Sequence, residues 1–220
     1  MGLIEIAAAK TIASAAVFLF ALLLLMAAAN RISTCIALFA MQSAVIAAQV
    51  LALAFVQHSA EAYLVGGLVL VVKVLAIPYA LFRIVERLKA PREVRASITA
   101  SQSAFVAAAL ILLAYLVVQP YVRALGLNAN MLAAAVALVL TGAFLMASRK
   151  QALMQVVGLL VLENGMFVAA MATTFGMPLV VEIGIFFDLL MGVLVMGLFV
   201  FRIRDTFEHL DVSRLRRLRG

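Results

Sequence analysis

This 220-residue chain contains few charged residues. Asp, Glu, Lys and Arg make up 12% of it, whereas they make up about a quarter of a soluble domain. Hydrophobic residues make up 67%. A core built from a chain of this length cannot hide so much apolar surface from water, so lipid must take up the rest. The composition therefore excludes a soluble globule and also excludes a disordered chain.

Thiols are almost absent as well. A single cysteine, Cys35, cannot form an internal disulfide and cannot supply the thiolates of an iron–sulfur cluster or a nickel site. No Ser-His-acid set, phosphate-binding loop or glycine-rich dinucleotide fingerprint occurs in the sequence. We therefore expect no cofactor in this chain, and any redox chemistry must belong to partner subunits.

Long apolar runs take the place of the missing charges. About 20 apolar residues are needed to cross a bilayer core of about 30 Å, and seven windows of that length are separated by charged or turn-forming segments. The sequence predicts an all-α membrane protein with about seven transmembrane helices. The predicted spans are about 5–29, 34–56, 62–84, 98–118, 129–147, 152–175 and 178–201.

The basic residues predict the orientation of these spans. Of the 17 Lys and Arg residues, fourteen fall in alternate connections and the tail, namely 31, 83–95, 149–150 and 202–219. Arg123 alone falls on the other side, while Lys10 and Lys73 lie within spans. By the positive-inside rule the amino terminus is outside and the carboxyl terminus inside. The net charge of +7 thus favours anionic lipid as a partner and argues against nucleic acid.

The spans also predict a division of the chain. Residues 1–97 would form a three-helix membrane unit with a basic inner loop, 98–128 a single connecting helix, and 129–220 a second three-helix unit with a basic tail. The two units would share one orientation, which is compatible with an ancient duplication.

Three ionisable residues fall near the middle of their predicted spans, where a charge costs about 2.5–3.5 kcal/mol on insertion scales. They are Lys73, Glu163 and Asp188. Burial favours the neutral forms of such groups, which lets them exchange protons. We therefore interpret them as members of a transmembrane proton path, with a purely structural ion pair between Lys73 and one carboxylate as the alternative.

Other polar residues add to this hypothesis. Pro78 follows Lys73 closely, which predicts a kinked or broken helix beside the amine. Glu182 begins the last span and would either feed protons to Asp188 or serve as a helix-dipole partner. Asn164, next to Glu163, can hydrogen-bond. Gln42, with Ser43 and Gln49, would bond neighbouring helices or line water.

The sequence resembles two known protein families, one over its last third and one over its whole length. Residues 149–220, with RKQALMQVVGLLVLENG, VEIGIFFDLLMGVLVMGLFVFR and LDVSRLRRLRG, are similar to the K subunit of respiratory complex I. The whole chain, with KVLAIP in its third span, resembles the hydrogenase-4 component E family, which belongs to the membrane arm of formate hydrogenlyase-type and complex I-like hydrogenases. In the resemblance to the K subunit, Asp188 matches the second buried glutamate of that subunit. The first buried glutamate of the K subunit falls on Leu160, one turn before Glu163.

The resemblance implies a non-catalytic protein of the membrane arm that lies between antiporter-like membrane subunits and a quinone-site-like membrane subunit, beneath a peripheral redox arm. Iron–sulfur clusters and a nickel–iron centre or quinone are then expected in those partners. The expected location is a bacterial or archaeal cytoplasmic (inner) membrane. The sequence leaves two alternatives open: a self-contained secondary transporter and a purely structural membrane spacer.

Overall fold

The structure is a computed structural model that describes the backbone of residues 3–87, 93–94, 96–125 and 129–174, and the side chains within 15–86, 93–94, 96–122 and 129–173. Within these residues every regular element is a helix, and there is no β-strand. The elements are α1 (Leu3–Ala28), α2 (Ile32–Gln57), α3 (Ala60–Val69), the π-helix η1 (Leu70–Ala76), α4 (Ile77–Arg87), α5 (Ala100–Leu125), α6 (Ala129–Ser148) and α7 (Ala152–Thr174).

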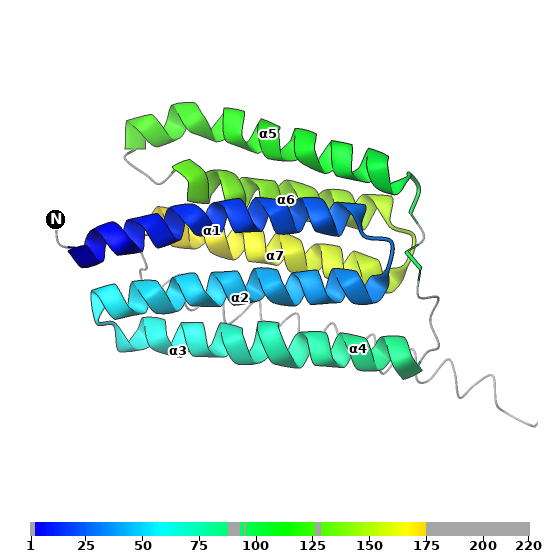
Figure 1. Cartoon of the computed structure of the whole chain (residues 1–220), viewed down its shortest axis with the longest axis horizontal. Coiled ribbons are helices and arrows are strands. Elements are labelled where there is room, and N and C mark those ends of the chain that lie inside the picture. Colours follow the sequence, from blue (N-terminus) through cyan, green and yellow to red (C-terminus); the bar gives the residue numbers. More distant parts are fainter. Residues whose placement is uncertain (1–2, 88–92, 95, 126–128, 175–220) are drawn as a thin grey trace, which may run out of the picture.

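The helices form one antiparallel bundle (Figure 1). The segments α3, η1 and α4 follow one another without a break and make a single rod that packs along α2. Helix α1 lies against α2, α5 and α6, and α6 lies against α5 and α7. This arrangement puts α1, α2, α6 and α7 around a common centre.

Five helical stretches of the described part are long and apolar enough to cross a membrane. They are Ile32–Gln57, Ala60–Glu86, Ala100–Val122, Ala129–Ser148 and Ala152–Thr173. They match the five predicted spans from 34–56 to 152–175, and they make the chain a multi-pass membrane protein. The predicted first span coincides with α1, whose part Ala15–Ala28 is a shorter apolar helix, while the predicted span 178–201 lies outside the described residues.

Large apolar side chains also cover the outside of the bundle. Leu64 is 75% exposed and Phe105 is 77% exposed. Water would penalise this surface, whereas lipid chains do not, because the free energy of burying an apolar side chain comes from removing it from water. The outer surface therefore fits a lipid environment.

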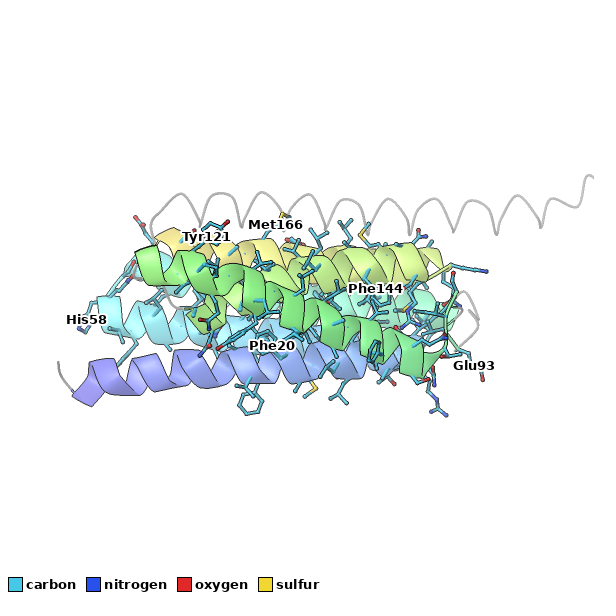
Figure 2. All side chains as sticks on the ribbon, turned by 90° about the horizontal axis from the view of Figure 1, so that it is seen from above. Phe20, His58, Glu93, Tyr121, Phe144 and Met166 are labelled. Atoms are coloured by element: carbon cyan, nitrogen blue, oxygen red, sulfur yellow. The ribbon has the colours of Figure 1, made fainter. Side chains whose placement is uncertain are left out.

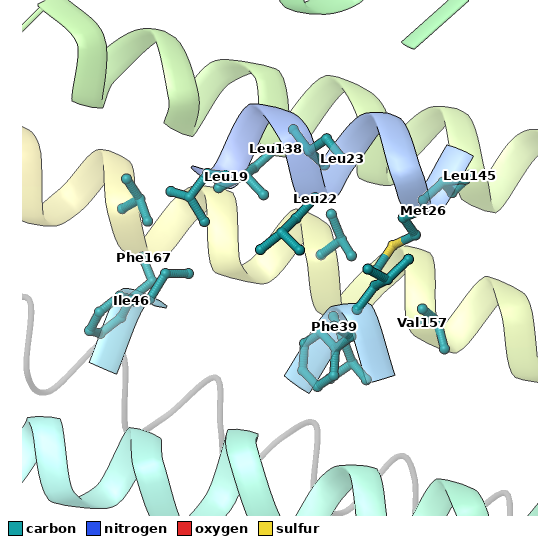
Figure 3. Close-up of a cluster of buried hydrophobic side chains, with 14 of the residues drawn as sticks. Leu19, Leu22, Leu23, Met26, Phe39, Ile46, Leu138, Leu145, Val157 and Phe167 are labelled. Atoms are coloured by element: carbon teal, nitrogen blue, oxygen red, sulfur yellow. The ribbon is translucent and has the colours of Figure 1, made fainter. Parts of the chain in front are cut away.

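Large apolar side chains fill most of the centre of the bundle (Figure 3). Leu19, Leu22, Leu23 and Met26 of α1 meet Phe39 and Ile46 of α2, Leu138 and Leu145 of α6, and Val157 and Phe167 of α7. All ten side chains are at least nine-tenths buried.

Helices α6 and α7 approach each other through glycines. A Cβ atom placed on Gly142 would lie 2.5 Å from the backbone nitrogen of Leu162, and one on Gly165 would lie 2.7 Å from that of Val139. Only a residue without a side chain allows backbones to come this close. The close approach of α6 and α7 therefore requires glycine at these two positions.

The connections alternate between the two ends of the bundle. Helix α2 turns into α3 at one end, where His58 adopts a left-handed conformation (φ 51°) and Ser59 accepts a hydrogen bond from the Ala62 N–H. The α1–α2 and α6–α7 turns and the α4–α5 connection lie at the other end (Figure 1). His58 and Glu93 mark the two ends in Figure 2.

Backbone hydrogen bonds join the three connections at the second end. The Val94 N–H donates to the Asn30 carbonyl at 2.8 Å, and the Ser97 N–H donates to the Ser148 carbonyl at 3.0 Å. Exposed Arg31 and Lys150 lie in the same connections. Of the basic residues predicted to face the inside, Arg31, Arg149 and Lys150 thus lie at this end of the bundle, while the side of the membrane that this end faces stays a prediction.

Candidate functional site

A buried ion pair crosses the bundle near its middle. Lys73 Nζ lies 3.0 Å from Glu163 Oε1, and the two side chains are 2% and 3% exposed. Each residue is near the centre of its membrane-spanning helix, Lys73 on the α3–η1–α4 rod and Glu163 on α7. The two charges compensate each other where either one alone would be costly.

Lys73 is presented by a π-helical turn. The segment Leu70–Ala76 is a π-helix, and the Ile77 N–H bonds to the Val72 carbonyl five residues back. Pro78 follows and has no N–H to donate, which favours a local departure from α-helical bonding. The predicted irregularity beside the lysine is therefore present, as a π-helix rather than a break.

Asn164 joins the ion pair to α2. Its Oδ1 accepts a hydrogen bond from Lys73 Nζ at 3.3 Å, and its Nδ2 donates to Ser43 Oγ at 3.2 Å. Asn164 and Ser43 are both fully buried. Successive residues of a helix point about 100° apart, so Glu163 and Asn164 together reach two different neighbours of α7.

An aromatic ring completes the surroundings of the ammonium group. Lys73 Nζ lies 5.5 Å from the centre of the Phe167 ring, and Phe167 comes one helical turn after Glu163. The negative face of an aromatic ring attracts a cation. Residues of one face of α7 therefore supply both the carboxylate and the ring.

The predicted polar residues of α2 have different outcomes. Ser43 bonds Asn164 as described, and Gln49 Nε2 contacts Met131 Sδ of α6 at 3.2 Å, so both make the expected bonds between helices. Gln42 is fully buried, but neither of its amide atoms has a hydrogen-bond partner among the described residues.

Two predicted site residues lie outside the described residues, Asp188 and Glu182. Within the described part, the carboxylate that pairs with Lys73 belongs to Glu163. The structure therefore unites Lys73, Glu163 and Asn164, while the roles proposed for Asp188 and Glu182 stay predictions.

Arg149 has a buried position that the sequence did not predict. The sequence showed it only as one of the inner basic residues, yet it is 3% exposed and its Nη2 donates to the Ala27 carbonyl at 2.8 Å and to Ser103 Oγ at 3.2 Å. Burial lowers the pKa of its guanidinium below the usual value, but arginine stays charged in proteins. Arg149 thus ties the end of α1 and the start of α5 to the α6–α7 turn. No pattern in the sequence distinguishes it from Lys150, which is exposed.

Among the described residues, no group of three or more His, Cys, Asp and Glu side chains could hold a metal ion. The one cysteine, Cys35, is buried. Proton exchange and charge compensation are the chemistry that the described polar cluster can provide.

Curated proteins from two bacteria are similar to this chain over long stretches. The chain is 37% identical over 157 residues to Uncharacterized protein Rv0085 of Mycobacterium tuberculosis, an alignment that covers 70% of this chain and 71% of that protein. It is 36% identical over 119 residues to Hydrogenase-4 component E of Escherichia coli, covering 53% of this chain and 55% of that protein.

No protein-family model matches the chain, and no solved structure matches it. The similarity to Hydrogenase-4 component E spans about half of that protein, whereas the similarity to the mycobacterial protein spans more than two thirds. The chain therefore belongs to the same family as Uncharacterized protein Rv0085 of Mycobacterium tuberculosis.

Proposed function

We propose that this protein is a membrane-arm subunit of a complex I-like hydrogenase or related oxidoreductase, and that Lys73 and Glu163 belong to its proton path. The buried ion pair in the middle of the bundle carries this proposal. The similarity to Hydrogenase-4 component E supports the assignment to a hydrogenase-type complex. A membrane span that needed only to fill space would avoid two charges at this depth, because both are costly to insert.

In this proposal Glu163 is the group that accepts and releases the proton. As a carboxylate it is compensated by the Lys73 ammonium 3.0 Å away. When a proton binds Glu163, the carboxyl group becomes neutral and the ammonium loses its countercharge. The positive charge of Lys73 then favours release of the proton. Lys73 thus controls how readily Glu163 releases its proton.

Asn164 holds the two groups in register during this exchange. Its Oδ1 stays a hydrogen-bond acceptor for the ammonium whether or not Glu163 carries a proton, and its Nδ2 anchors it to Ser43 on α2. Lys73 can therefore remain in place while the charge of Glu163 changes.

The remaining parts of the proposal come from the sequence. Asp188 would be a second proton-exchanging carboxylate, and Glu182 would supply it from the outer side. Moving one charge across a membrane is worth about 2.3 kcal/mol per 100 mV, so the driving energy must come from electron transfer in partner subunits. Those partners would be antiporter-like and quinone-site-like membrane subunits and a peripheral redox arm that holds the iron–sulfur and nickel–iron centres.

The proposed orientation places the end with Arg31, Arg149 and Lys150 on the cytoplasmic side of a bacterial or archaeal inner membrane. Their gathering at one end of the bundle supports this orientation. Anionic lipid would neutralise the exposed Arg31 and Lys150 there.

Two experiments test the function. First, the tagged full chain is purified from its native membrane and the co-purifying proteins are identified by mass spectrometry. Iron–sulfur or nickel proteins in that set are expected. Recovery of the chain alone, with solute uptake after reconstitution in liposomes, would instead identify a secondary transporter.

Second, Glu163→Gln is introduced into the assembled complex and proton uptake is measured in inverted membrane vesicles. We expect assembly and electron transfer to persist while proton uptake falls. Glu61→Gln is the matched control, because Glu61 is an exposed carboxylate in the first turn of α3. Unchanged proton uptake in an intact Glu163→Gln complex would leave the chain a structural spacer.

A further inference from the structure

Gln42 is a buried amide inside the apolar centre of the bundle. It is 0% exposed, and neither Oε1 nor Nε2 has a hydrogen-bond partner among the described residues. Phe39 precedes it by three residues and Ile46 follows it by four, which puts all three on one face of α2. Phe39 and Ile46 both point into the core that α1, α6 and α7 share with α2 (Figure 3).

Thr141 occupies the corresponding position on α6. It is also 0% exposed, and its hydroxyl has no partner within the described part of the chain. Leu138 and Leu145 flank it by three and four residues and belong to the same core (Figure 3). A threonine hydroxyl in a helix usually bonds the carbonyl one turn earlier. The Thr141 hydroxyl does not make this bond, so it is available for a different partner.

The two side chains lie at similar depths in the bundle. Helices α2 and α6 run in opposite directions (Figure 1), and the contact between Gln49 and Met131 sets their register. At the rise of an α-helix, Gln42 is about 10 Å from Gln49 along α2 and Thr141 is about 15 Å from Met131 along α6, in the same direction. The two polar groups are therefore within about 5 Å of one level.

Buried polar groups of native proteins are almost always satisfied, by protein or by ordered water. Buried waters occur where two to four polar groups can bond them. Gln42 offers two donor hydrogens and an acceptor oxygen, and Thr141 offers one donor and an acceptor. We propose that Gln42 and Thr141 together form a buried water-binding site in the core between α1, α2, α6 and α7.

This site lies beside the ion pair but does not depend on the function proposed for it. Ser43, next to Gln42 in the sequence, bonds Asn164 and through it reaches Lys73. Water at Gln42 would continue this polar connection from α7 across α2 towards α6. The hydration inference rests on the two buried polar side chains alone, so it can hold in a chain that moves no protons.

Solid-state NMR of the full chain in lipid bilayers tests the inference. Magnetisation is transferred from water protons to ¹⁵N-labelled glutamine side chains, and the Gln42 signal is assigned by its loss in Gln42→Met. Methionine is unbranched and similar in volume, so the core should tolerate it. We expect water-to-Nε2 transfer at Gln42, although the residue has no exposed surface. Transfer at exposed Gln155 without any at Gln42 would overturn the inference.

The share of Thr141 is tested with a matched pair of variants. Thr141→Val keeps the shape of the side chain and removes the hydroxyl, so the transfer from water to Gln42 should be lost. Thr99→Val removes an exposed hydroxyl near the start of α5 and should leave the transfer unchanged. Full transfer in Thr141→Val would show that Thr141 does not hold the water and would overturn the two-residue site. Neither result depends on proton uptake in Glu163→Gln, so failure here and failure of the proposed function are separate outcomes.

Discussion

Replacing Lys73 with methionine should strongly destabilise the bundle. The substitution keeps an unbranched apolar stem but leaves the carboxylate of Glu163 without the ammonium that lies 3.0 Å from it. It also removes the hydrogen bond to Asn164 Oδ1. Breaking a buried ion pair from one side costs about 3–5 kcal/mol. For a chain of this size we expect the Tm to fall by about 6–20 °C.

The chain contains a built-in reporter for this measurement. Cys35 is the one cysteine of the sequence; it lies on α2 and is fully buried in the core. A thiol-reactive fluorescent dye should therefore label the detergent-solubilised protein only when the bundle opens. The absence of tryptophan rules out the usual intrinsic fluorescence, which makes the thiol the more useful probe.

A second substitution separates lost charge compensation from lost packing. Replacing both charged residues, as Lys73→Met with Glu163→Met, removes the uncompensated carboxylate and should restore most of the lost Tm, because apolar replacements of whole buried pairs are commonly neutral or stabilising. Lys150→Met, at an exposed lysine, should change stability by no more than about 0.5 kcal/mol. A Lys73→Met protein as stable as the wild type, or a double variant no more stable than the single one, would refute the reasoning.

Three further predictions follow from other parts of the bundle. Gly142→Ala should cost about 1–3 kcal/mol, because its Cβ would lie 2.5 Å from the backbone of α7. Gly67→Ala has open space around it and should add up to about 1 kcal/mol through helix propensity; equal effects of the two in thermal melts would contradict the close α6–α7 packing. Arg149→Met should cost about 1.5–3 kcal/mol, since it removes charged hydrogen bonds to α1 and α5, and a melt like that of Lys150→Met would show these bonds to be unimportant. In a background without the native cysteine, His58→Cys should react with a membrane-impermeant thiol reagent from the periplasmic side and Lys150→Cys only after the cytoplasmic side is opened; labelling of both from one side would contradict the proposed topology.

Much of the site could be predicted from the sequence, one residue at a time. Lys73 and Glu163 stood out because each interrupts an apolar run near its middle, and a charge there needs compensation. The irregular helix beside Lys73 could be predicted from Pro78, whose missing N–H disturbs helical bonding. These inferences use only local spacing, which the linear sequence contains.

The partners of these residues could not be predicted in the same way. Lys73 could have paired with Glu163 or with Asp188 as far as the sequence was concerned, and only the packing of the described helices places Glu163 within 3.0 Å. The ring of Phe167 and the burial of Arg149 depend equally on which helices are neighbours. A long apolar helix has no polar face that would show which side packs against another helix. The hydropathy pattern therefore does not predict such contacts.

The sequence by itself determined that this protein is embedded in lipid and which of its connections carry positive charge. It also determined, to within a few residues, at which positions the described spans begin and end. Those properties depend on the free energy of transfer between water and hydrocarbon, which is nearly additive along a chain. Only the tertiary structure decided that Lys73 and Glu163 meet, that Asn164 links them to α2, and that Gln42 and Thr141 face one core. These contacts depend on close packing between helices whose outer and inner faces have almost the same composition.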